Sequence, residues 1–210
     1  ALLSLGQING KQAGIGFSLS TPIVYYNLDL LSKAGLDEQA LPTNWDDIIV
    51  LAERARQATP GTNGLHYDWE VTGNWLWQAM VFSKGGTMLN ADESQVAFNG
   101  QVGRESIAQM GRMVQNGTMQ NLTYADAQQL FVNGKLAVLS TSTSRLASIE
   151  KQIGDKFRMK TGFFPVYSEA GKVPAGGNVA MMFAQDPERQ KAAWEYIKFA
   201  TGPQGAVIMT

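Results

Sequence analysis

The sequence of 210 residues contains no cysteine and a single histidine, His66. Without cysteine there is no disulfide, no thiolate nucleophile and no thiolate-bound zinc or iron–sulfur cluster. A single imidazole also excludes any metal site that needs two histidine ligands, and no catalytic partner for His66 is evident. We therefore expect no metal ion, no cofactor and no catalytic residue, and we interpret His66 as a packing or surface residue.

Charge of one sign and long apolar runs are also lacking. The 17 basic and 18 acidic residues leave a net charge of −1, which argues against a nucleic-acid-binding protein because such proteins carry a basic excess. No apolar run approaches the roughly 20 residues that cross a bilayer. A hydrophobic content of 44% is typical of a globular protein, and the length fits one large domain or two small ones.

Single strands alternate with helices along the chain, which predicts an α/β fold rich in helix. We expect strands at 23–26, 136–140, 162–167 and 179–184, the last covered on both faces because it is continuously apolar. We expect helices at 27–34, 74–83, 104–116, 126–132 and 146–153, and another that starts with a capping box at 43–46 and ends near Ala58. A further helix starts after Asp186, with proline and glutamate in its first turn, and ends before Gly202.

The acidic residues do not form a convincing catalytic pair. Asp46 and Asp47 are adjacent, and neighbouring side chains on a helix point about 100° apart, so they cannot flank one bond as glycosidase carboxylates do. Their position in the first turn of a helix favours a dipole-stabilising role. There is no glycine-rich phosphate loop, and a turn before the 179–184 strand explains Gly176 and Gly177.

Two groups of residues suit a binding site. Tyr67, Trp69, Trp75 and Trp77 lie within eleven positions, and such aromatics either stack on a sugar ring and wall a cleft or fill the core. Residues 140–144 are five consecutive hydroxyl side chains between a buried strand and a helix, where backbone N–H groups also point at a polar or anionic ligand. Helix capping accounts for one or two hydroxyls, which leaves about three for a ligand.

The order of motifs resembles the extracellular solute-binding proteins of ABC importers, in particular the class that binds sugars and glycerol-3-phosphate. The resemblance rests first on residues 20–36, STPIVYYNLDLLSKAGL, and on residues 130–138, LFVNGKLAV. Weaker matches are PTNWDD at 42–47, GFFP at 162–165, GGNV at 176–179 and FATGP at 199–203. Together they span nearly the whole chain.

This resemblance implies a periplasmic-binding-protein-like (type II) two-lobed clamshell that closes about a hinge. The chain would hold the end of one N-terminal-lobe segment at 1–20, the C-terminal lobe at 24–160 and a return to the N-terminal lobe at 165–210. Crossovers would lie near 18–24 and 161–166. Because the chain starts with alanine and stops within a helix-like segment, we expect an internal fragment of a longer protein.

The resemblance also implies a function and a site. A monomeric, non-enzymatic protein would capture a sugar or phosphorylated polyol and deliver it to an ABC permease. Its location would be the periplasm, or the extracellular face as a membrane-anchored lipoprotein in a Gram-positive host. The positions that match ligand contacts are Ser20, Trp75, Ser142, Ser144 and Gly177. Two alternatives stay open: a glycan-active hydrolase with two acids in the Trp75 cleft, and an interaction module with fully buried tryptophans.

Overall fold

The computed structural model describes residues 2–70 and 74–209. The chain separates into two compact units, one made of residues 21–174 and the other of residues up to 20 together with those from 175 onward. We call them the central unit and the outer unit. No helix in the described ranges is both long and apolar enough to cross a membrane.

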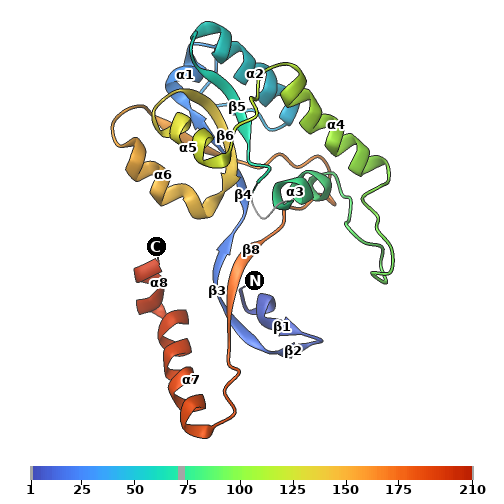
Figure 1. The fold of residues 1–210 in the computed structure, drawn as a ribbon, viewed down its shortest axis with the longest axis vertical. Helices are drawn as coiled ribbons and strands as arrows, with labels where there is room; N and C mark the ends of the chain where they lie inside the picture. The colour runs from blue at the N-terminus through green and yellow to red at the C-terminus, as the bar shows by residue number, and fades with distance from the viewer. Residues whose placement is uncertain (1, 71–73, 210) are drawn as a thin grey trace. The chain divides into compact units, whose positions relative to one another are not determined.

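A four-stranded sheet forms the middle of the central unit (Figure 1). Its strands are β4 (Pro22–Asn27), β5 (Asn63–Tyr67), β6 (Leu136–Ser142) and β7 (Met159–Phe163), in the order β5-β6-β4-β7. Strands β5 and β6 are parallel, whereas β4 runs antiparallel to both β6 and β7. The carboxyl ends of β5, β6 and β7 therefore share one edge of the sheet with the start of β4.

One face of this sheet packs against α1 (Leu28–Ser32), α2 (Trp45–Ala58), α3 (Trp75–Ser83) and α4 (Gln101–Gln115). Trp45 is the largest side chain of this core, fully buried and in edge contact with Tyr67. Helix α2 starts one residue later than the predicted capping box at 43–46 implies, because Asn44 is the cap and its side chain accepts a hydrogen bond from the Asp47 N–H, with two acids in the first turn.

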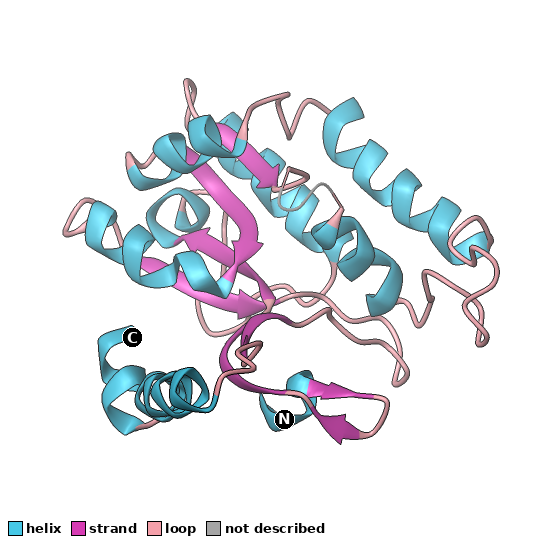
Figure 2. Ribbon diagram, turned by 60° about the horizontal axis from the view of Figure 1, so that its bottom comes forward, coloured by secondary structure: helices cyan, strands magenta, loops and turns pink. Residues whose placement is uncertain are grey.

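The opposite face packs against α5 (Tyr124–Val132) and α6 (Leu146–Ile153), which follows a short 3₁₀ turn, η2 (Thr143–Arg145). Figure 2 shows the helices arranged on both sides of the sheet. Tyr25, Phe131 and Leu139 form the centre of this second core. Helix α5 begins two residues earlier than the sequence predicts, because Thr123 is its N-cap. Helix α6 has the predicted bounds.

The outer unit contains η1 (Leu2–Gly6), β1 (Gln7–Ile8), β2 (Lys11–Gln12), β3 (Gly14–Ser20), β8 (Gly176–Met181), α7 (Pro187–Thr201) and α8 (Pro203–Met209). Strands β3 and β8 form an antiparallel ribbon. The Asp186 cap and the proline at the start of α7 are confirmed.

Two expectations for the outer unit are wrong. Gly176 and Gly177 lie in strand β8 and not in a turn, because they pair with Ser20 and Leu19 of β3. The apolar run at 179–184 is not covered on both faces. The strand ends at Met181, and Phe183 is 85% exposed, since a two-stranded ribbon leaves its faces open.

The chain reaches the outer unit again at residue 175. Strand β7 pairs with β4, so the two predicted crossover segments do lie side by side, with Ile23 opposite Phe163. The chain beyond β7 then stays with the central unit through residue 174. The Tyr167 N–H donates to the Ser83 carbonyl at 2.9 Å, and the Lys172 N–H donates to the Phe82 carbonyl at 2.9 Å. These backbone bonds hold residues 166–174 beside the end of α3.

Candidate functional site

The carboxyl edge of the central sheet carries a cluster of polar side chains. Asp68 follows β5 directly, and its carboxylate accepts a hydrogen bond of 2.7 Å from the Thr141 hydroxyl of β6. The Asp68 N–H donates to the Ser140 carbonyl at 3.0 Å. All three residues are fully buried, so these bonds fix the ends of β5 and β6 relative to each other. Sequence reasoning missed Asp68, although its place at a strand end was a usable signal.

The hydroxyl run at 140–144 lies at this edge, but fewer of its groups are spare than predicted. The Ser140 hydroxyl donates to the Ile23 carbonyl at 3.2 Å, and the Thr143 hydroxyl accepts from the Thr21 N–H at 3.0 Å. With Thr141 bound to Asp68, three of the five are already used. The prediction of about three free hydroxyls is wrong because strand β6 extends to Ser142 and buries the first part of the run.

Ser142 and Ser144 form the outer end of this cluster. Their hydroxyl oxygens lie 2.9 Å apart, and the Ser142 hydroxyl accepts from the Ser144 N–H at 3.2 Å, which caps η2. Ser142 is buried at 6% exposure, whereas Ser144 is exposed. A hydroxyl can donate and accept at once, so the pair can still present a hydrogen bond to a ligand at Ser144.

A cation adjoins the hydroxyl run. The guanidinium of Arg145 lies 5.2 Å from the centre of the Tyr124 ring, and Arg145 is exposed. Burial raises the pKa of the Tyr124 phenol, so the ring stays neutral. The Tyr124 N–H donates to the Glu70 carboxylate at 2.6 Å. A guanidinium beside hydroxyls favours a polar or anionic ligand over a cation. Arg145 was not predicted as a site residue, although it directly follows the five hydroxyl side chains in the sequence.

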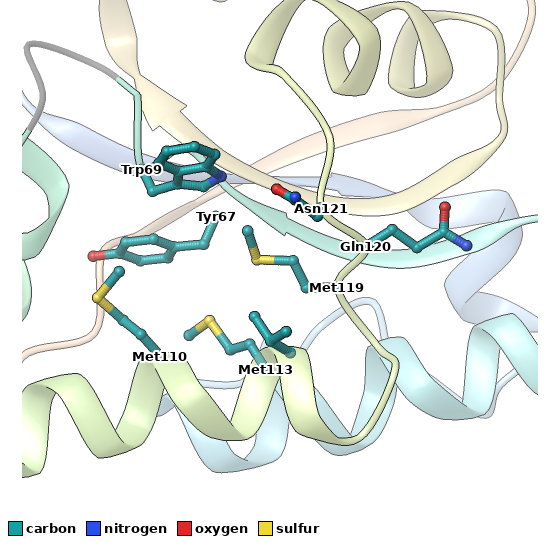
Figure 3. Close-up of a pocket in the computed structure, with 8 residues that line it drawn as sticks. Tyr67, Trp69, Met110, Met113, Met119, Gln120 and Asn121 are labelled. Carbon is teal, nitrogen blue, oxygen red and sulfur yellow. The ribbon is translucent and has the colours of Figure 1, made fainter.

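The four predicted aromatics do not form one wall. Tyr67 is fully buried in the core, and Trp77 is in edge contact with Phe98 at 5.1 Å between ring centres. Trp75 is half-buried and packs against the first core, and that it lines a ligand cleft stays a prediction. Trp69 is the open one at 43% exposure, and it lines a pocket with Tyr67 (Figure 3).

Ser20 and Gly177 lie together in the outer unit, on adjacent strands of its ribbon. The backbone explains the glycine, because a Cβ at Gly177 would lie 2.4 Å from the carbonyl oxygen of Ser18. The structure thus places two predicted site residues in the outer unit and Trp75, Ser142 and Ser144 in the central unit. That all five contact one ligand stays a prediction.

His66 and Asp46 both occupy structural settings. His66 is fully buried, both of its ring nitrogens are without a hydrogen-bond partner among the described residues, and burial lowers its pKa to about 4. Hydrogen bonds from Gln109 and Arg112 hold the pKa of Asp46 below its usual value, as expected of a structural acid. In the part of the chain that the structure describes, no three metal-ligating side chains cluster.

Comparison with known proteins gives relatives along the whole chain. The sn-glycerol-3-phosphate-binding periplasmic protein UgpB of Escherichia coli is 25% identical over 203 residues, which are 90% of this chain and 45% of that protein. The cyclic alpha-maltosyl-1,6-maltose binding protein of Arthrobacter globiformis is 26% identical, with a TM-score of 0.75 over 97% of this chain and 52% of that one.

A third relative shows the same fold at greater sequence distance. UgpB of Mycobacterium tuberculosis, solved in complex with glycerophosphocholine, is 21% identical, with a TM-score of 0.84 over 99% of this chain and 54% of that one. The chain thus spans about half the length of the relatives it matches, and its architecture is that of two-lobed periplasmic solute-binding proteins. The family model for bacterial extracellular solute-binding proteins matches residues 1–210, and the chain belongs to that family.

Proposed function

We propose that this chain is part of the substrate-binding component of an ABC importer, which captures a sugar or a glycerol-3-phosphate-like solute and delivers it to the membrane permease. The observation that carries the proposal is the family match over residues 1–210. Relatives named for sn-glycerol-3-phosphate and for a cyclic maltosyl-maltose support this range of solutes. The protein would act as a monomer, without nucleic acid, in the periplasm or as an extracellular lipoprotein.

The proposed site lies at the carboxyl edge of the central sheet. Ser144 and the Ser142 hydroxyl would hold the polar end of the solute, with Arg145 beside them as the complement to a phosphate. Trp75 would stack on the apolar face of the solute. Ser20 and Gly177 would contribute from the outer unit, and closure about the hinge would complete the site.

The proposed action is binding without catalysis. A hydrolase needs two carboxyl groups about 5 to 9.5 Å apart across the scissile bond. The two acids near this edge serve other partners, since Asp68 accepts from Thr141 and Glu70 accepts from the Tyr124 N–H. Neither is offered to a solute as a free acid, so no observation favours the hydrolase.

Calorimetric titration of the full-length protein with sn-glycerol-3-phosphate, glycerophosphocholine and maltose tests the proposal. Saturable binding of at least one of them is expected, and chromatography afterwards should recover that ligand intact. Release of product at a rate that scales with protein would instead support the hydrolase. Absence of binding by all three would remove the proposed solute range.

A further inference from the structure

The central unit has a pocket at the end of β5, and none of the hydroxyl residues 140–144 lines it. It has a volume of about 340 Å³ and is bounded by the end of β5, by α4 and by the segment after α4. Its lining consists of Tyr67, Trp69, Met110, Met113, Val114, Met119, Gln120 and Asn121. Figure 3 shows Trp69 and Tyr67 on one side, with Met110 and Met113 rising from α4 and Met119 between them.

The pocket is apolar and uncharged. Two aromatic rings, three methionines and a valine provide most of the wall, and the amides of Gln120 and Asn121 are its polar side chains apart from the Tyr67 phenol and the Trp69 N–H. The Tyr67 hydroxyl already donates to the Leu76 carbonyl. Burial raises the pKa of this phenol well above 10, so it adds no negative charge. No charged side chain stands among the described residues that line the pocket.

The hollow opens to solvent above a buried floor. Water in it meets few polar partners, because most of its wall is apolar. Here Met113 is fully buried and Met119 is 7% exposed, yet Trp69 beside them keeps 43% of its surface in solvent. A guest that covers the indole and touches the methionine sulfurs would remove that apolar surface from water.

We propose that this pocket is a binding site for a neutral, compact apolar group, about the size of a tert-butyl or phenyl substituent. A cation would gain from the indole face but would lose its hydration without any carboxylate in the lining to replace it. Flexible methionines let the wall adapt to different shapes, so the site would select by polarity and volume more than by exact outline.

The position of the pocket connects it to the polar edge. Trp69 follows Asp68, and the Asp68 carboxylate is bound to Thr141 next to Ser142. A solute held by its polar end at the hydroxyl cluster could therefore place an apolar substituent against Trp69. This last step rests on the proposed function, whereas binding of the apolar group by the pocket does not.

An isosteric pair of probes tests the charge selectivity directly. We would titrate 3,3-dimethyl-1-butanol and choline into full-length protein with carbon-13-labelled methionine methyl groups. The two molecules have almost the same shape, but the alcohol is neutral and choline carries a positive charge. The alcohol should shift the methyl signals of Met110, Met113 and Met119 saturably, with a Kd on the order of 1 mM. Choline should bind at least tenfold more weakly. The signals of Met80 and Met182 serve as internal controls.

A matched pair of variants tests the location. Val114→Phe places a ring in the pocket and should weaken the alcohol at least tenfold. Ile107→Phe adds the same ring two turns earlier on α4, at a position that is 56% exposed and lines a different hollow, and should leave binding unchanged. Choline binding as tightly as the alcohol, pocket signals that move no more than the controls, or equal effects of the two variants would each overturn the inference. Because no sugar or polyol is used, these results are independent of the proposed function.

Discussion

The two units of the chain differ in how completely they bury their apolar residues. The central unit has two cores, one on each face of its sheet, with Trp45, Tyr25 and Phe131 fully buried. In the outer unit, Ile197 is the one buried large hydrophobic residue among those described. Large exposed apolar side chains there include Leu19, Met182, Phe183, Trp194, Tyr196, Phe199, Val207 and Ile208. Within these residues, the central unit therefore has a core on each face of its sheet, whereas the outer unit leaves apolar surface uncovered, and the chain spans about half the length of its relatives.

Replacing one tryptophan by alanine in each unit tests this difference in burial. Trp45 is fully buried and touches Tyr67 and Phe164 with ring centres 5.2 Å away in each case, whereas Trp194 is 43% exposed. Trp45→Ala should lower the free energy of unfolding by about 3–5 kcal/mol, because it leaves a large cavity. In this 210-residue chain, Trp194→Ala should change it by about 1 kcal/mol or less. Denaturant unfolding measures both, and equal losses would contradict the comparison.

Acid should act on the central unit through His66. Burial lowers its pKa from 6.5 to about 4, so the folded state favours neutral imidazole while the unfolded chain takes up a proton below 6.5. The free energy of unfolding should therefore fall as the pH is lowered from 6.5 to about 4, by roughly 3 kcal/mol from this residue alone.

A control variant separates the effect of His66 from that of the acidic residues. Carboxyl groups with lowered pKa values, such as that of Asp46, also destabilise the folded protein when acid protonates them. His66→Leu should remove the histidine part of the pH dependence, so the difference in unfolding free energy between wild type and variant should change only between pH 6.5 and about 4 and stay constant outside that window. Parallel pH profiles for the two proteins would show that His66 is not held neutral in the folded state.

Two glycines sharpen the comparison between the units. A Cβ at Gly177 would lie 2.4 Å from the Ser18 carbonyl oxygen, whereas a Cβ at Gly111 on α4 would meet no atom within 4 Å. Gly177→Ala should force β3 and β8 apart and destabilise the ribbon by about 1–3 kcal/mol. Gly111→Ala should stabilise the central unit by about 0.5–1 kcal/mol, because alanine favours helix. Hydrogen exchange of each unit measures both effects, and a stabilised ribbon in Gly177→Ala would be incompatible with the close approach.

The smallest effect in this series concerns binding and not folding. Trp75→Ala in the full-length protein should weaken solute binding about tenfold through lost stacking. Trp77→Ala is the matched control on the same helix, since its ring contacts Phe98, and it should leave the affinity within about twofold. Calorimetry gives both affinities, with whichever of the three candidate solutes binds the wild-type protein. Equal losses would mean that the helix, and not the Trp75 ring, supports the site.

The sequence predicted what depends on local chemistry. The Asp186 cap and the proline after it mark the start of α7, and proline and glycine mark several helix ends, so seven helices could be located to within a few residues from the local sequence alone. The alternation of these helices with strands was enough for the α/β class, and the family motifs were enough for the two-lobed fold.

What the sequence could not show depends on pairing between distant segments. Ser20 meets Gly176 across 156 positions of chain (176 − 20), and this pairing turns the expected glycine turn into a strand. The Thr141–Asp68 bond likewise joins residues 73 positions apart and uses a hydroxyl that local reasoning left for a ligand. Trp69 is 43% exposed and Trp75 is half-buried, and this difference also depends on packing that the local sequence does not show.

The central claim is that the Ser142–Ser144 end of the hydroxyl run holds the polar end of the solute. Calorimetry of the full-length Ser142→Ala, Ser144→Ala double variant tests it most directly, with Ser148→Ala on the exposed surface of α6 as control. The two lost hydrogen bonds should weaken binding by tenfold or more, while circular dichroism shows a folded protein. An affinity equal to that of the wild type and the control would contradict the account.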